Sequence, residues 1–149
     1  MKLIKEHILF GVLDSQQTIN VVQNTLPNHG WRIIDFEIFP QSHADINLDP
    51  NSAKSAKLTT FNVAGPDFHT TFDYDKNTVV GVASFCGGVQ SNMIDSATLI
   101  VNDLFVTQML TSPGVTNSKT CYQIILEQYD ISDDEQVLAI IRENSQSID

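Results

Sequence analysis

The chain has few positively charged residues. Only eight of its 149 residues are Lys or Arg, against eighteen Asp or Glu, and its formal net charge at pH 7 is −10. The shortage is greatest in residues 58–149, which hold three basic and twelve acidic residues, whereas residues 1–57 hold five and six. Nucleic acids and anionic membranes are bound through clustered Lys and Arg. We therefore expect neither to be a direct partner.

Cysteines and long apolar runs are also scarce. Cys86 and Cys121 are the only cysteines, fewer than a secreted disulfide scaffold of this size usually carries, so we expect two free, buried thiols in a reducing compartment. No run approaches the roughly 20 apolar residues of a membrane span. The N-terminal "MKLIKEHILFGVL" begins like a secretion signal, but Lys5, Glu6 and His7 interrupt it and no small-residue cleavage site follows. We interpret it as a strand.

The common catalytic and nucleotide-binding motifs are absent as well. There is no G-x-S-x-G, P-loop or G-x-G-x-x-G, and the glycines of "FCGGVQS" lack the strand-to-helix context of a phosphate-binding loop. The four histidines, His7, His29, His43 and His69, show no metal-binding spacing, and no feature assigns a base to Cys86. We therefore predict a protein that is not an enzyme, with no catalytic, metal-binding or cofactor-binding residue.

One polar stretch, "DINLDPNSAK" (45–54), has the alternate oxygen ligands of the front half of a calcium loop. These are Asp45, Asn47 and Asp49. An EF-hand needs Gly at its sixth position and Glu at its twelfth, where this chain has Pro50 and Ala56, so an EF-hand is excluded. A looser cation site using Asp45 and Asp49 stays open, but we favour a solvated loop.

Two further patterns suggest alternative functions. Asp73 and Asp75, close to Asp67, fall on one predicted strand face, and two carboxyls about 5–9 Å apart could serve a small hydrolase acting on glycosides. Trp31, together with the loop at 40–57, could serve a carbohydrate-binding or other ligand-binding β-sandwich. We favour carboxylates that merely decorate a strand, and a tryptophan that packs at the rim of the core.

Short runs with period-two alternation, separated by turn-forming residues, predict antiparallel strands. We expect eight, at about 3–12, 17–23, 31–39, 58–63, 68–74, 78–86, 97–109 and 120–129. In "WRIIDFEIF", Ile34, Phe36 and Ile38 should share the buried face. "NTVVGVASFC" is apolar on both faces, as in a central strand, and its Gly81 suggests a bulge or a close backbone approach. Residues 40–57 show no periodicity and should form a projecting loop.

After Tyr129 the apolar period changes from 2 to 3.6, which predicts a helix over 132–144. Ser132 and Glu135 have the spacing of a capping box. The apolar stripe of Val137, Leu138 and Ile141 should pack on the sheets or on a neighbouring subunit. The whole pattern predicts an all-β protein: a single domain over 1–149, folded as an antiparallel, jelly-roll-like β-sandwich of about eight strands with one C-terminal α-helix.

Two segments, "ATLIVNDLFVTQML" (97–110) and "CYQIILEQYDISDDEQVLAIIREN" (121–144), resemble the closing hairpin and terminal acidic helix of small accessory virion proteins of tailed bacteriophages. The resemblance implies a β-rich protein that assembles symmetrically on a capsid or tail. It supplies no catalytic or ligand-binding residues. Because genome-contacting coat proteins carry basic arms, an acidic chain is expected on the outside of a virion or at a protein-only joint.

The function predicted from the sequence is therefore structural. We expect a capsid decoration or cement protein in the virion, assembled in the host cytoplasm. Its partners would be further copies of itself and virion proteins such as the major capsid protein. A surface completed by Ser, Thr, Asn and Gln instead of Lys and Glu suits such contacts.

Overall fold

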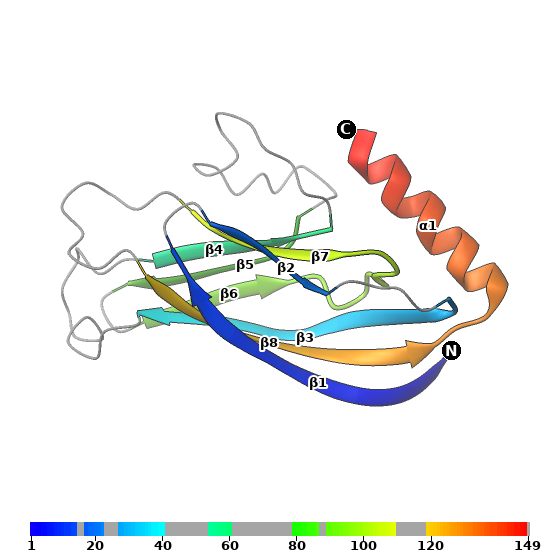
Figure 1. Ribbon diagram of the computed structural model, residues 1–149, viewed down its shortest axis with the longest axis horizontal. Coiled ribbons are helices and arrows are strands. Elements are labelled where there is room, and N and C mark those ends of the chain that lie inside the picture. The colour runs from blue at the N-terminus through cyan, green and yellow to red at the C-terminus, as the bar shows by residue number, and fades with distance from the viewer. Residues whose placement is uncertain are drawn as a thin grey trace.

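The fold is a two-layer β-sandwich with a C-terminal helix (Figure 1). It is seen in a computed structural model, which describes residues 1–14, 17–22, 27–40, 54–60, 79–86, 89–109 and 119–148. The elements of these residues are β1 (Lys2–Leu13), β2 (Thr18–Val22), β3 (His29–Pro40), β4 (Lys54–Thr59), β5 (Val79–Cys86), β6 (Val89–Ile94), β7 (Leu104–Gln108), β8 (Thr120–Asp130) and α1 (Asp133–Ile148). The predicted fold class, an all-β antiparallel sandwich with one terminal helix, is confirmed.

The strand order is jelly-roll-like, except that β6 pairs with β5 and does not extend the sheet of β3. One sheet has the order β1-β8-β3 and the other β2-β7-β4-β5-β6, and every pairing is antiparallel. The chain alternates between the sheets from β1 to β4, and β8 returns between β1 and β3. Since β7 and β8 lie in different sheets, the segments 97–110 and 121–129 do not form the hairpin on which the virion resemblance partly relied.

The core lies between the two inward faces. The three-stranded sheet contributes Ile33, Phe36, Ile38, Ile124 and Leu126, and the five-stranded sheet contributes Ala56, Leu58, Phe85, Leu104 and Val106. Complete burial of one such large apolar side chain contributes about 1.5–3 kcal/mol. This core holds the two sheets face to face and thereby leaves the opposite face of the three-stranded sheet pointing outward.

A β-bulge in β3 makes one predicted face assignment wrong. The register against β8 shifts between Ile33 and Asp35, so Ile33 takes the buried position and Ile34 is exposed. Phe36 and Ile38 are buried as expected. A bulge adds one residue to one strand and reverses the alternation on its far side. The period-two pattern alone therefore misplaced Ile34.

The predicted loop at 40–57 is wrong in its last part. β4 begins at Lys54 and occupies the middle of the five-stranded sheet, between β7 and β5. Ala56 and Leu58 face the core, while Lys57 lies on the opposite side of the strand and is nonetheless fully buried. Lys54 and Lys57 make this short strand look polar in the sequence. The long alkyl stem of a lysine nevertheless packs readily on apolar surface. Residues 41–53 lie outside the described residues.

Other strand predictions were shifted or merged. The long strand expected at 97–109 is two features: β7, and a separate bridge in which Trp31 and Ile100 exchange two backbone hydrogen bonds of 2.8 Å. β6 was not predicted, because its inward side is polar: Asn92 donates hydrogen bonds to the Phe36 carbonyl (2.8 Å) and the Asp35 carboxylate (3.1 Å). The strand expected at 68–74 lies outside the described residues.

β5 matches its prediction as a central strand. It lies between β4 and β6, and Val80, Val82, Ala83 and Phe85 are buried. A Cβ added to Gly81 would lie 3.2 Å from a methyl carbon of Leu58, next to a register shift between Leu58 and Thr59. Of the two expected alternatives, the irregularity is present, whereas the close contact at Gly81 is with a side chain and not with another backbone.

Helix α1 begins as predicted but packs differently. The Glu135 amide donates to the Ser132 hydroxyl (3.2 Å), as in a capping box. Ala139 is buried with Val101 and Ile131, whereas the predicted stripe of Val137, Leu138 and Ile141 is more than half exposed. The prediction that this stripe packs on the sheets is therefore wrong. Packing on a neighbouring subunit stays a prediction.

Polar contacts fix this orientation of the helix. Asn28, with a positive φ of 60°, donates from its backbone amide to the Gln136 side chain (3.0 Å) and from its side chain to Asp133 (2.6 Å). Nearly two turns after Gln136, Arg142 donates to the Thr98 hydroxyl (3.1 Å). These bonds turn the Ala139 face of the helix inward, at the end of the sandwich seen on the right of Figure 1.

Candidate interaction surface

The outward side of the three-stranded sheet, here called the outer face, is built from cross-strand rows of β1, β8 and β3. The rows are Val12–Cys121–Phe39, Phe10–Gln123–Glu37, Ile8–Ile125–Asp35 and Glu6–Glu127–Arg32. Strand alternation puts these residues opposite the buried Ile124 and Leu126. The composition of the outer face therefore changes from apolar in the first row to charged in the last.

The apolar part of the outer face is exposed. The exposed fraction is 51% for Ile8, 75% for Phe10, 41% for Val12 and 43% for Phe39. Together with Cys121 and Ile125 these residues form what we call the outer-face patch. The solvent side of an antiparallel sheet is ordinarily polar, and contiguous exposed apolar surface marks contact sites.

The patch is hollowed at its apolar end. A depression of about 290 Å³ is lined by Phe10, Val12, Phe39 and Cys121, together with Gly11, Tyr122 and Gln123. A Cβ at Gly11 would meet the Tyr122 hydroxyl at 2.7 Å, so the absence of a side chain there lets the tyrosine lie close to β1. Aromatic side chains beside a hollow of this size provide both an anchor and a recess for a partner surface.

A polar cluster borders the patch at the other end. The Tyr129 hydroxyl donates to the Glu127 carboxylate, and the Arg32 guanidinium lies over the Tyr129 ring, 5.4 Å from its centroid. The hydrogen bond to Glu127 is the main cause that raises the pKa of Tyr129. Apolar surface with a polar rim is the usual anatomy of a protein–protein interface.

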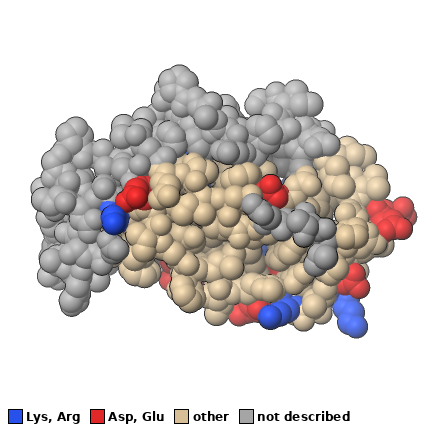
Figure 2. Space-filling view, viewed as in Figure 1, with Lys and Arg blue, Asp and Glu red and all other residues tan. Residues whose placement is uncertain are grey.

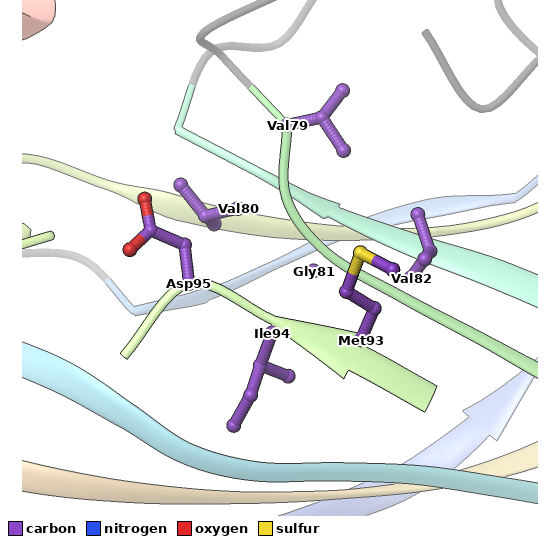
Figure 3. Close-up of a pocket in the computed structure, with 7 residues that line it drawn as sticks. All are labelled: Val79, Val80, Gly81, Val82, Met93, Ile94 and Asp95. Atoms are coloured by element: carbon purple, nitrogen blue, oxygen red, sulfur yellow. The ribbon is translucent and has the colours of Figure 1, made fainter. Parts of the chain in front are cut away.

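A second depression, of about 180 Å³, lies at the end of the β5–β6 hairpin (Figure 3). Its walls are Val79–Val82 and Met93–Asp95. Among the described residues that line it, Asp95 is the one carboxylate, and it accepts hydrogen bonds from the Ala97 and Thr98 amides (3.1 and 3.2 Å) and from the Thr98 hydroxyl. Asp95 thus braces the following turn, and the described lining of the depression holds no acid–base pair.

The structure places some of the sequence candidates in structural roles. Trp31 is half-buried against the main core and bonds through its backbone to Ile100, so it packs at the rim as expected. His7 shares a 2.8 Å hydrogen bond with the Gln128 side chain, and His29 shares one of 2.8 Å with the Pro27 carbonyl. None of these three rings stands in an open site.

Both cysteines are free, as predicted, but only one is shielded. Cys121 is half-buried in the outer-face patch, and burial raises the pKa of its thiol. Cys86 is exposed at the end of β5, so its predicted burial is wrong. The apolar run "VVGVASFC" continues to the last residue of the strand, where the chain already leaves the core.

The remaining candidates cannot be placed. Outside the described residues lie the calcium-like loop with Asp45, Asn47 and Asp49, the carboxylates Asp67, Asp73 and Asp75, and the histidines His43 and His69. Within the described ranges, no three His, Cys, Asp or Glu side chains gather as they would around a metal ion. In the same part of the chain, no helix is long and apolar enough to span a membrane.

Charged side chains are sparse on the surface in view. Figure 2 shows the Lys, Arg, Asp and Glu side chains of the described residues mostly near the margins of that face, with a broad uncharged area between them.

The outer-face patch itself was missed by sequence analysis. Its signal was present in "HILFGVL", where apolar residues occupy both faces of one strand although only one sheet face can be covered by the sandwich.

No family model, curated protein or solved structure matches the chain. Its function is therefore inferred from its own fold, charge and surface.

Proposed function

We propose that this chain is a non-enzymatic structural protein of a bacteriophage virion, a capsid decoration or cement protein. It acts through protein–protein contacts in a symmetric oligomer, and its partners are further copies of itself and virion proteins such as the major capsid protein. It is assembled in the host cytoplasm and resides in the virion.

The observation that carries the proposal is the outer-face patch. Phe10 is three-quarters exposed beside Val12 and Phe39, on a sheet face that nothing in the described chain covers. Burial of apolar surface yields roughly 25 cal/mol per Å², so covering this patch is favourable for any well-fitting protein partner.

The charge distribution limits which partners fit. The net charge of −10 and the scarcity of Lys and Arg disfavour nucleic acid and anionic lipid as ligands of this face. A position on the exterior of a capsid, away from the packaged genome, suits an acidic protein.

The fold is compatible with this role. Jelly-roll sandwiches occur in viral capsid proteins and also in lectins, so the fold narrows the function only slightly. The resemblance to accessory virion proteins now depends on the terminal acidic helix, since β7 and β8 are not a hairpin. The carbohydrate-binding alternative loses its platform because Trp31 packs against the core.

Co-sedimentation with virions that lack this chain, assembled from the encoding genome with this one gene deleted, tests the proposal. The added wild-type protein should move with the particles in a density gradient, and Phe10→Ser should lower the bound fraction at least tenfold. Val89→Ser is the matched control, because Val89 is also an exposed apolar strand residue but belongs to β6 of the other sheet. Wild-type protein that stays at the top of the gradient, or equal losses for the two variants, would overturn the proposal.

A further inference from the structure

The long outer edge of β1 has no partner strand among the described residues. β1 is the outermost strand of its sheet, and among the described residues its backbone pairs only with β8. It runs twelve residues, Lys2–Leu13. A free edge of this length presents a row of unpaired N–H and C=O groups, which is a template for another strand.

The other sheet edges are shorter or already in contact. β3 is bonded across its edge to Ile100 and, through Asn92, to β6. β2 has five residues and β6 has six. Within the described strands, β1 therefore offers the longest free edge.

The side chains of β1 suit pairing with a second copy of the same strand. In antiparallel pairing about a two-fold axis perpendicular to the sheet, both copies keep their outer faces on the same side. A register centred on Glu6 sets two carboxylates against each other. A register centred on Ile8 sets Ile8 against Ile8 of the second copy and Glu6 against Phe10, with no like charges directly opposite, along the regular part of the strand that follows a β-bulge between Leu3 and Lys5. Facing apolar side chains stabilise a strand pair, and like charges directly opposite each other destabilise it.

We infer that β1 pairs antiparallel with β1 of a second copy of this chain, in the register centred on Ile8. The two three-stranded sheets then join into one continuous sheet of the order β3-β8-β1-β1-β8-β3. The two outer-face patches become neighbours on the same side, so the dimer presents a doubled apolar surface to the virion partner. The inference rests on the proposed function in that it names the self-contact of the symmetric oligomer.

Two lysine substitutions separate edge pairing from face contacts. Ile8→Lys places two ammonium groups opposite each other at the two-fold axis, whereas Ile125→Lys changes the neighbouring outer-face residue on the central strand β8, away from the edge. Light scattering after size exclusion should give twice the 16.6 kDa chain mass for wild type and Ile125→Lys, and the chain mass for Ile8→Lys. Circular dichroism should confirm that all three are folded.

Three outcomes would overturn the inference. Wild-type protein that is monomeric at every concentration has no such contact. Loss of the dimer in Ile125→Lys as well as in Ile8→Lys would show that the copies meet through their outer faces. A trimer or other odd assembly cannot be built by this two-fold pairing alone.

Cross-linking tests the register. In a Cys86→Ser, Cys121→Ser background, Ile8→Cys should form a disulfide-linked dimer on mild oxidation, because directly opposite Cβ atoms lie about 4.5–5.5 Å apart. Phe10→Cys should remain unlinked, since in this register Phe10 faces Glu6 of the second copy. Equal linking of the two variants, or linking of Phe10→Cys alone, would contradict the register.

Different results would overturn the proposed function and the β1 contact. A dimer that does not sediment with virions would overturn the proposed function and leave the β1 contact intact. A monomer that sediments with them would overturn the β1 contact alone.

Discussion

Ile8 of β1 and Ile125 of β8 are direct cross-strand partners on the outer face of the three-stranded sheet. Ile8 is half exposed, at 51%, and Ile125 is partly buried between its neighbours. Their pairing places two apolar side chains in the middle of a face that water ordinarily wets. The proposed contact function requires that a protein partner cover this face.

The bulge in β3 predicts that alanine substitution of two adjacent isoleucines will destabilise the protein by very different amounts. Ile33→Ala should lower the free energy of unfolding by about 2–5 kcal/mol, because Ile33 is fully buried in the core. Ile34→Ala should cost about 1 kcal/mol or less, since Ile34 is exposed at the bulge. Urea denaturation measures both, and a larger cost for Ile34 would restore the simple alternation and contradict the observed register.

Replacement of Asn28 by glycine should destabilise the protein less than its replacement by alanine. Its φ of 60° is accessible to Gly but costs a residue with a Cβ roughly 1–2 kcal/mol. Both substitutions remove the hydrogen bond to Asp133, worth about 1.5–3 kcal/mol when a charged group accepts it. Thermal melts should rank the variants wild type, Asn28→Gly, Asn28→Ala. Equal stability of the two variants would show that the backbone relaxes.

The two thiols should react at different rates. At about pH 8, iodoacetamide should modify exposed Cys86 before half-buried Cys121, whose raised pKa leaves less of the reactive thiolate. Raising the pH increases the thiolate fraction of Cys121, so its rate should keep rising until the pH passes that raised pKa. Mass spectrometry of the two tryptic peptides follows this, and faster modification of Cys121 would contradict its placement in the patch.

The loop with Asp45 and Asp49 is predicted to bind no calcium. The melting temperature should be the same in millimolar calcium and in chelator, because a ligand that binds only the folded state stabilises it. An increase of several degrees with calcium, lost in Asp45→Asn plus Asp49→Asn, would show a cation site there.

The sequence predicted what depends on local patterns. Alternation gave the strands β1, β3, β5 and β8, and the spacing of Ser132 and Glu135 gave the start of α1. What it missed depends on long-range pairing. The bulge at Ile34 arises only against β8, burial of Lys57 arises only within a five-stranded sheet, and β6 is held by Asn92 reaching across to β3.

Which residues form the outer-face patch could not be predicted, for the same reason. Apolar residues on both faces of β1 indicate a strand, but they do not say which face the second sheet covers. Likewise, the helical period placed Val137 and Leu138 on one stripe without saying that Ala139 would face the core. Which apolar surface remains exposed is decided by tertiary packing.

Hydroxyl-radical footprinting of the protein, alone and bound to virions, tests the central claim most directly. Phe10 and Met93 are both strongly exposed in the single chain, at 75% and 62%, and lie on different sheets. Oxidation of Phe10 should fall severalfold on binding, while that of Met93 should change little. Phe10 that stays as reactive in the bound protein as in the free chain would contradict the assignment of the outer face as a contact surface.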